Sequence, residues 1–105
     1  MKLNREYIFN LLTLIPKGKV VTYKELAIKC GNKGLVRAIG NLLHTNVEKF
    51  KYPCYKVVSS KGKLSSNYKF GGITEQERLL KLDGIDVINK KVNLDKYLYK
   101  FGNDN

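Results

Sequence analysis

The sequence predicts a mostly α-helical, single-domain protein with a winged helix-turn-helix fold and a small β-hairpin wing. Three observations lead to this prediction. The chain has 105 residues, which is the size of one domain. Two amphipathic segments are joined by four residues that include two glycines, the pattern of a helix-turn-helix. A short β-prone segment with a turn and a return follows them.

The first helix is expected over residues 4–15. Its apolar residues recur at helical spacing, at Ile8, Leu11, Leu12 and Ile15. Asn4 is a good N-cap, and Leu3 can form a hydrophobic staple with Ile8. Pro16 ends the helix, and residues 20–22 form a short β-like connector.

The helix-turn-helix follows this connector. Thr22 and Glu25 form a capping box for a helix that runs to about Cys30. Residues 31–34 form the turn, and the second helix covers residues 35–44. Its polar face carries Arg37, Asn41 and His44. Such a face is typical of a recognition helix, but an ordinary helical hairpin with a solvated face fits the spacing equally well.

The predicted wing comes next. Residues 55–59 read as a strand, residues 60–62 as a turn, and residues 63–64 as a short return strand. Residues 65–72 form a polar loop that ends in two glycines.

The last long helix is expected over residues 74–82. Thr74 and Glu77 form a second capping box, and Gly84 follows the helix as its C-terminal cap. Residues 92–99 are expected to form a short closing turn of helix whose aromatic side chains pack on the core.

Basic residues are concentrated in the middle of the chain. Twenty Lys and Arg residues against nine Asp and Glu give a net charge of +11. Residues 17–69 hold eleven lysines and Arg37 against two acids, whereas residues 70–105 are neutral overall. A localised basic field indicates a polyanionic partner, and nucleic acid is the first candidate. An AT-rich genome, which favours Lys at surface positions, explains the excess of Lys over Arg but does not explain why acidic residues are missing from residues 17–69.

Composition also excludes several classes of protein. No apolar run approaches the roughly 20 residues of a membrane-spanning helix, and the N-terminus lacks the features of a signal peptide. We therefore expect a soluble, cytoplasmic monomer. Two cysteines and one histidine are too few for a disulfide framework or a four-ligand zinc site, so no metal or cofactor is expected.

Cys54 is the candidate nucleophile. It follows a proline and has Lys49, Lys51 and Lys56 nearby in the sequence, and positive charge favours the reactive thiolate. The alternative is a buried structural thiol, which is the interpretation that the local sequence alone favours for Cys54 and, more strongly, for Cys30.

Five blocks of the chain have a distinctive order and spacing. They are IPKGKVVTYKELA (15–27), VRAIGNLLHTN (36–46), PCYKVVSSKGKLS (53–65), NYKFGG (67–72) and QERLLKLDGI (76–85). Together they resemble the C-terminal domain of O(6)-alkylguanine-DNA alkyltransferases (methylated-DNA–protein-cysteine methyltransferases) and their short alkyltransferase-like relatives. The resemblance implies a single alkyltransferase-type DNA-binding domain over residues 1–105, without the separate N-terminal domain of full-length repair proteins.

The resemblance implies binding to double-stranded DNA that contains O(6)-alkylguanine. The helix-turn-helix would enter the minor groove, and the damaged base would be flipped out of the stack. Arg37 would fill the vacated space, Ala38 and Gly40 would allow close approach to the DNA backbone, and Tyr23 would help to rotate the nucleotide. Further DNA contacts are expected from Asn41 and Lys56.

The resemblance also implies a chemical step. Cys54 would be the alkyl acceptor: its thiolate would attack the carbon bound to guanine O(6), and the thioether product would allow one turnover per molecule without cofactor or metal. Asn46 would tie the recognition helix to the active-site loop. The alkylguanine pocket would be lined by Val57, Tyr68, Lys69, Phe70 and Gly71.

The motif around the cysteine departs from that of the family. Pro-Cys-Tyr-Lys stands where Pro-Cys-His-Arg is usual. Tyr55 replaces the histidine that takes the thiol proton, and Asp83 stands where the glutamate partner of that histidine would be. A phenol with a pKa of about 10 is a poor base near neutral pH. Lys56 keeps the charge of the arginine but loses its bidentate geometry.

The sequence therefore leaves three hypotheses about function. The first is an active, slow alkyl acceptor that repairs DNA. The second is a non-catalytic damage sensor, like the alkyltransferase-like members. Those members typically lack the cysteine, so the presence of Cys54 favours the first. The third is a winged-helix regulator that reads DNA sequence, which we rank last because it would leave the pocket residues Tyr23, Tyr68, Gly71 and Gly72 without a purpose. His44 is expected to contact phosphate or solvent.

Overall fold

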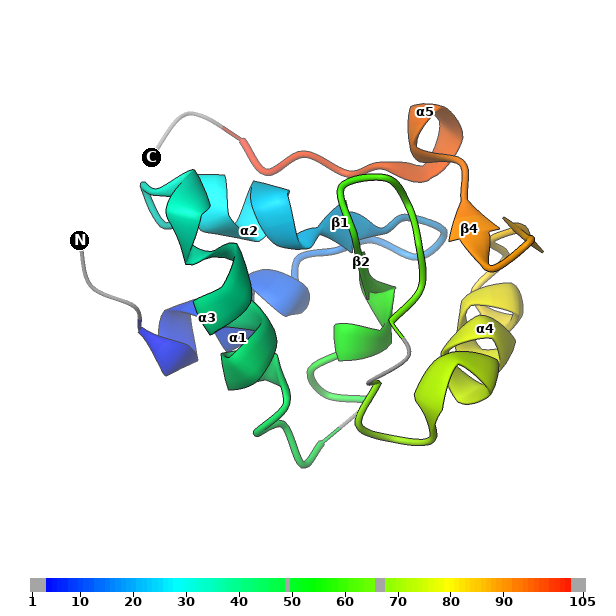
Figure 1. Ribbon diagram of the computed structural model, residues 1–105, viewed down its shortest axis with the longest axis horizontal. Helices are drawn as coiled ribbons and strands as arrows, with labels where there is room; N and C mark the ends of the chain where they lie inside the picture. Colours follow the sequence, from blue (N-terminus) through cyan, green and yellow to red (C-terminus); the bar gives the residue numbers. More distant parts are fainter. Residues whose placement is uncertain (1–3, 49, 66–67, 103–105) are drawn as a thin grey trace.

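Helices surround a short pair of parallel strands in the computed structural model, which describes residues 4–48, 50–65 and 68–102 (Figure 1). The α-helices are α1 (Arg5–Leu12), α2 (Tyr23–Lys29), α3 (Val36–Leu43), α4 (Gly72–Leu82) and α5 (Leu94–Tyr97). Two 3₁₀ turns, η1 (Lys33–Leu35) and η2 (Cys54–Lys56), precede α3 and β2. The strands are β1 (Val21–Thr22), β2 (Val57–Val58), β3 (Val87–Ile88) and β4 (Lys91–Val92). In the described part of the chain, no helix is long and apolar enough to cross a membrane.

The predicted fold class is confirmed, and two helix starts follow from local chemistry. The Asn4 side chain accepts a hydrogen bond from the Tyr7 amide at 2.9 Å, and the Thr22 hydroxyl accepts one from the Glu25 amide at 3.0 Å. The α2–η1–α3 unit forms the expected helix-turn-helix. Leu3, Lys49 and residues 66–67, which entered the sequence predictions, lie outside the described residues.

The predicted start of α4 is wrong. The helix begins at Gly72 with Gly71 as its N-cap residue, so Thr74 lies inside the helix and caps nothing. Long-range contacts fix this start. The buried Gln76 side chain accepts from the Ser65 amide at 2.8 Å and donates to the Tyr55 carbonyl at 3.0 Å. These hydrogen bonds hold the N-terminal part of α4 against η2, and they determine where the helix begins in place of the expected capping box. The expected end at Gly84, with φ of +85°, is confirmed.

The predicted pairing within the wing is also wrong. Residues 54–56 form η2 rather than a strand, and β2 pairs in parallel with β1, not with the return segment. A turn closed by the Ser59 amide and the Lys63 carbonyl at 3.0 Å follows β2. Lys63 then bridges to Lys91, beside the antiparallel pair β3–β4. The buried valines of β2 prefer the equally buried β1 as a partner.

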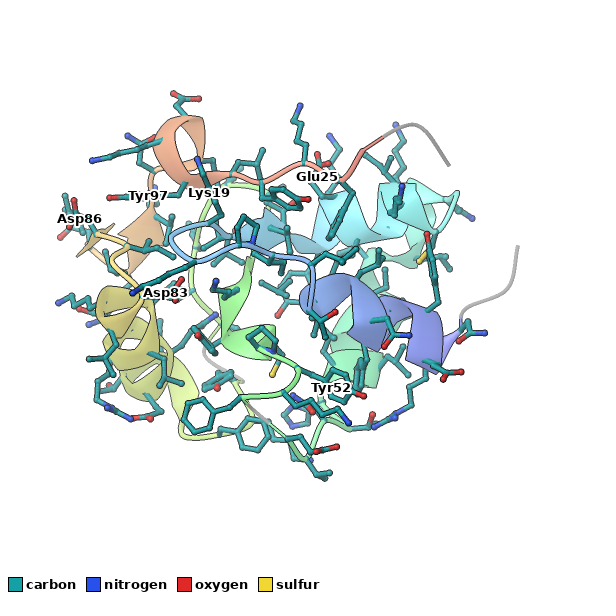
Figure 2. The ribbon with its side chains drawn as sticks, turned by 180° about the vertical axis from the view of Figure 1, so that it is seen from behind. Lys19, Glu25, Tyr52, Asp83, Asp86 and Tyr97 are labelled. Carbon is teal, nitrogen blue, oxygen red and sulfur yellow. The ribbon has the colours of Figure 1, made fainter. Side chains whose placement is uncertain are left out.

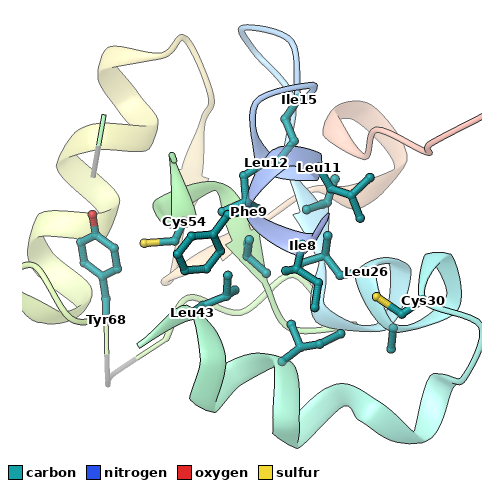
Figure 3. Close-up of a cluster of buried hydrophobic side chains, with 14 of the residues drawn as sticks. Ile8, Phe9, Leu11, Leu12, Ile15, Leu26, Cys30, Leu43, Cys54 and Tyr68 are labelled. Atoms are coloured by element: carbon teal, nitrogen blue, oxygen red, sulfur yellow. The ribbon is translucent and has the colours of Figure 1, made fainter. Parts of the chain in front are cut away.

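Two apolar clusters form the core. The larger lies among α1, α2 and α3 and includes Phe9, Leu12, Leu26 and Ile39, each at most 2% exposed (Figure 3). The smaller packs α4 and the C-terminal segment against β1 and β2. Each large side chain buried in this way contributes about 1.5–3 kcal/mol. Cys54 belongs to the larger cluster, so the core itself fixes the position of the candidate nucleophile.

Candidate functional site

A pocket of about 740 Å³ opens between α3, η2 and the segment that leads into α4. Its wall is formed by Tyr23, Gly40, Asn41, Leu43, His44, Cys54, Ser65, Tyr68, Lys69, Gly71 and Gly72. Eight of these residues were expected at the site from the sequence: Tyr23, Gly40, Asn41, Cys54, Tyr68, Lys69, Gly71 and Gly72. The volume lies within the range of small-molecule sites. We call it the Cys54 pocket.

Cys54 is held at the inner wall of this pocket by Asn46. The Asn46 amide nitrogen donates to the Cys54 sulfur at 3.3 Å and to the Tyr52 carbonyl at 2.8 Å. Its oxygen accepts from the Glu48 amide at 3.0 Å. Asn46 is fully buried, so one side chain fixes the loop between α3 and η2. Figure 3 shows the Cys54 sulfur directed toward Tyr68.

The environment of Cys54 disfavours its reactive form. Burial raises the pKa of the Cys54 thiol, and this effect exceeds the opposing influence of the Asn46 hydrogen bond and the positive charge of Lys69. Because only the thiolate is a good nucleophile, most molecules carry the unreactive thiol near neutral pH. The positive charge of the lysines near Cys54 in the sequence does not lower the thiol pKa as much as burial raises it.

Tyr68 presents a hydroxyl that lacks a partner in the described structure. Its side chain is 8% exposed, and its oxygen is buried without a hydrogen bond. Burial is the first cause that raises the pKa of this phenol, and the nearby Cys54 is the second. The hydroxyl therefore stays protonated. An unpaired buried hydroxyl costs about 1–3 kcal/mol, which a hydrogen-bonding ligand in the pocket would offset.

The recognition helix α3 contributes one wall and an exposed face. Gly40 and Asn41 line the Cys54 pocket, while Arg37 is exposed on the same helix. Ala38 is half-buried. Across the pocket, the Tyr23 side chain hydrogen-bonds with Ser65, and burial raises the pKa of its phenol. The helix-turn-helix and the pocket thus form one continuous site.

Lys56 does not have the role predicted for it. Its side chain is 4% exposed, and its ammonium nitrogen lies 2.8 Å from an Asp83 carboxylate oxygen. The same nitrogen donates to the Pro16 carbonyl at 2.9 Å. A buried, paired ammonium is not available to DNA phosphate, so the expected DNA contact is wrong. Figure 2, which shows the molecule from behind, places Asp83 beside the segment that joins α1 to β1.

Asp83, which stands at the position of the family glutamate, has partners within the fold. The same Asp83 oxygen that meets Lys56 also accepts from the Gly18 amide at 2.8 Å, so the carboxylate holds the fold together instead of orienting Tyr55. Burial, followed by the negative charge of Asp83, raises the pKa of the Tyr55 phenol. Tyr55 therefore stays protonated near neutral pH and is a poor general base for the thiol proton.

Two residues expected in the pocket lie beside it. The Val57 carbonyl accepts from the Gln76 side chain at 3.2 Å, and Val57 is fully buried. Phe70 packs edge-on against Tyr68 with ring centroids 5.8 Å apart, and lines a separate hollow.

Sequence reasoning did not place Leu43, His44 or Ser65 in the pocket, and for His44 it expected contact with phosphate or solvent. His44 lies one helical turn beyond Gly40, and this spacing was a usable signal. Within the described ranges, no three His, Cys, Asp or Glu side chains are grouped closely enough to hold a metal ion.

Comparison with known proteins agrees with this geometry. Residues 4–85 match the family described as 6-O-methylguanine DNA methyltransferase, DNA binding domain. The match covers most of the chain, which therefore belongs to this family.

Individual relatives add detail. A bifunctional methyltransferase/endonuclease of Picrophilus torridus is 40% identical over 93 residues, which are 89% of this chain and 30% of the relative. A DNA base-flipping protein of Vibrio parahaemolyticus is 37% identical over 94 residues, 89% of this chain and 92% of the relative. The chain thus spans about a third of the length of several curated relatives it matches.

The structure is also similar to that of S. pombe Atl1 in complex with damaged DNA containing O6-carboxymethylguanine. The TM-score is 0.84 at 25% identity, and the similarity covers 96% of this chain and 100% of Atl1. Methylated-DNA–protein-cysteine methyltransferases are among the relatives, including one from Rattus norvegicus. The similarity thus extends both to named methyltransferases and to a protein bound to damaged DNA.

Proposed function

We propose that this protein binds O(6)-alkylguanine in duplex DNA, takes the flipped base into the Cys54 pocket, and accepts the alkyl group on Cys54. The observation that carries the proposal is the composition of one pocket. It joins a cysteine sulfur, the unpaired Tyr68 hydroxyl and the recognition helix α3. The named functions of the Vibrio base-flipping protein and the Atl1 complex support the same partner.

The transfer is a direct displacement. The Cys54 thiolate attacks the carbon attached to guanine O(6), a sulfur–carbon bond forms, and the carbon–oxygen bond breaks. The electron pair of the broken bond stays on guanine, which takes up a proton. The thioether is not hydrolysed, so each molecule acts once. Because burial raises the pKa of the Cys54 thiol, the step is slow near neutral pH.

Intact-mass measurement tests the transfer. After incubation with a duplex that contains O(6)-methylguanine, we expect one added methyl group on the peptide with Cys54 and none on Cys30. Cys54→Ser should lose the transfer and keep DNA binding, because the pocket wall and α3 remain. A gel shift without any DNA affinity at low salt would overturn the whole proposal.

The pH dependence tests the nature of the slow step. Below the thiol pKa the transfer rate should rise about tenfold per pH unit, since the thiolate fraction does so. Tyr55→His should raise the rate near pH 7 and flatten this dependence, because imidazole is a competent base there. An equally steep profile in the variant would show that position 55 does not reach the thiol proton.

A second candidate function is a damage sensor that binds the lesion without chemistry. The raised pKa of Cys54 and the engagement of Asp83 by Lys56 favour it. A wild-type protein that binds the lesion, yet gains no mass after long incubation at about pH 8.5, near the ordinary pKa of a thiol, would be this sensor.

A further inference from the structure

Two lysines face each other where the turn after β2 meets β4. Lys63 pairs with Lys91 in an isolated antiparallel bridge. The neighbouring residues Leu64 and Val92 are buried, with 7% and 3% of their surfaces exposed. Since side chains alternate between the two faces of a strand, Lys63 and Lys91 both stand on the outer face, and both are exposed. We call them the wing lysine pair.

Backbone contacts fix the pair on both sides. The Val92 amide donates to the Gly62 carbonyl at 2.8 Å, and the Leu64 amide donates to the Lys90 carbonyl at 3.1 Å. A Cβ at Gly62 would lie 2.3 Å from the Val92 carbonyl oxygen. Only glycine allows this close approach, so the turn is built to lie against the strand that carries Lys91.

No ion pair among the described residues compensates the charge of this pair, although Asp86, which accepts from the Tyr97 hydroxyl at 3.1 Å, lines the same hollow as Lys91. Residues directly opposite in an antiparallel pair have Cβ atoms about 4.5–5.5 Å apart, and like charges there are destabilising. The acid at Glu77 is already paired with Lys81 at 2.8 Å and with Lys90 at 3.2 Å. Among the described residues, Lys61, Lys63 and Lys91 make no ion pair.

One member of the wing lysine pair lies close to the Cys54 pocket. Lys63 is two residues from Ser65, which lines the pocket and hydrogen-bonds with Tyr23. Two residues of chain span at most about 7 Å. In Figure 1 the turn is drawn in front of β1, on the side of the molecule that also carries α3. Lys63 therefore lies close in the chain to one wall of the Cys54 pocket, whereas Lys91 lines a separate hollow with Asp86 and Lys96.

We propose that Lys63 and Lys91, with Lys61 beside them, form a second phosphate-binding surface that holds the DNA backbone next to the flipped nucleotide. This inference rests on the proposed function and extends the contact beyond α3. A phosphate oxygen between two ammonium groups forms charge-assisted hydrogen bonds to both. The repulsion that the free protein carries is then relieved in the complex.

Salt-dependent binding of a fluorescent duplex tests the proposal. The variant K63Q/K91Q should lower the slope of log affinity against log salt by about 2, because each lost phosphate contact removes about 0.9. The preference for O(6)-methylguanine over guanine should stay unchanged, since the pocket is intact. The melting temperature of K63Q/K91Q without DNA should equal or exceed that of the wild type, so unfolding would not explain the lower slope.

The matched control is K17Q/K100Q. Both residues are exposed and lie outside the pocket and the turn, and the variant removes the same charge. Its slope should match that of the wild type. An unchanged slope in K63Q/K91Q, or an equal loss in the control, overturns the proposal while the proposed function stands. A wild type without DNA affinity overturns the proposed function and this inference together.

Discussion

At the scale of single residues, Lys56 shows how one buried charge takes a role that the sequence did not reveal. Its ammonium and the Asp83 carboxylate are 2.8 Å apart, with side chains 4% and 15% exposed. Removing one partner of a buried pair leaves the other charge uncompensated. We expect Lys56→Met to lower the free energy of unfolding by about 3 kcal/mol, as measured by urea denaturation.

The surface pair of Lys81 and Glu77 provides the control for this prediction. Lys81 is 55% exposed, so Lys81→Met should cost less than about 1 kcal/mol. The slope of DNA affinity against salt should be the same in Lys56→Met as in the wild type, because the buried ammonium does not meet phosphate. A reduced slope in a folded Lys56→Met protein would restore Lys56 as a DNA contact.

The residue scale is also where sequence prediction was least complete. Cys54, Tyr23 and Tyr68 meet in one pocket as their motifs implied. The partner of Asp83 could not be read from the chain, because Lys56 lies 27 positions away and only the packed fold brings the two together. The raised pKa of Cys54 depends on burial, whereas the sequence showed only its basic neighbours.

At the scale of elements, α3 gives a variant that separates stability from binding. A Cβ at Gly40 would meet only the Tyr23 ring, at 3.9 Å, which is an ordinary contact. Glycine inside a helix costs roughly 0.5–1 kcal/mol relative to alanine. We therefore expect Gly40→Ala to raise the melting temperature of the free protein and to weaken its DNA binding, because the added methyl group lies on the face of α3 that we propose approaches the DNA.

Thermal melting and fluorescence anisotropy on the same preparation decide this prediction. A more stable Gly40→Ala variant that binds DNA as tightly as the wild type would show that α3 does not come close to DNA at this position. A less stable variant would show instead that Gly40 serves the packing of α3 against α2.

Helix starts whose signals are local were predicted correctly, whereas the first helix, expected over residues 4–15, ends at Leu12, and elements that depend on distant contacts were not predicted. The N-caps Asn4 and Thr22 bind amides three residues away, so their patterns alone identify them. The start of α4 depends on Gln76 reaching Tyr55, 21 positions earlier. β2 likewise found its partner in β1, 36 positions earlier. A capping box and a hairpin turn were reasonable local alternatives that tertiary contacts overrode.

At the scale of the whole molecule, we expect the basic surface to provide affinity for any duplex and the Cys54 pocket to provide the preference for the lesion. The excess of basic residues lies in residues 17–69, the segment that includes α2, α3 and most of the pocket wall. Phosphate contacts bind any duplex and weaken as salt rises, because counterions compete for the same phosphates. The residues that line the Cys54 pocket are mostly uncharged, and the Tyr68 hydroxyl among them is buried without a hydrogen bond in the described structure.

This division predicts how affinity and lesion preference respond to salt. Between about 50 mM and about 200 mM salt, affinity for any duplex should fall by roughly 10³-fold, the loss typical of six phosphate contacts. The ratio of affinities for O(6)-methylguanine and guanine duplexes should stay nearly constant, because the discriminating contacts release no counterions. Anisotropy titrations of both duplexes at each salt concentration measure the two quantities together. A ratio that collapses with the affinity would mean that lesion preference comes from the charged surface and not from the Cys54 pocket.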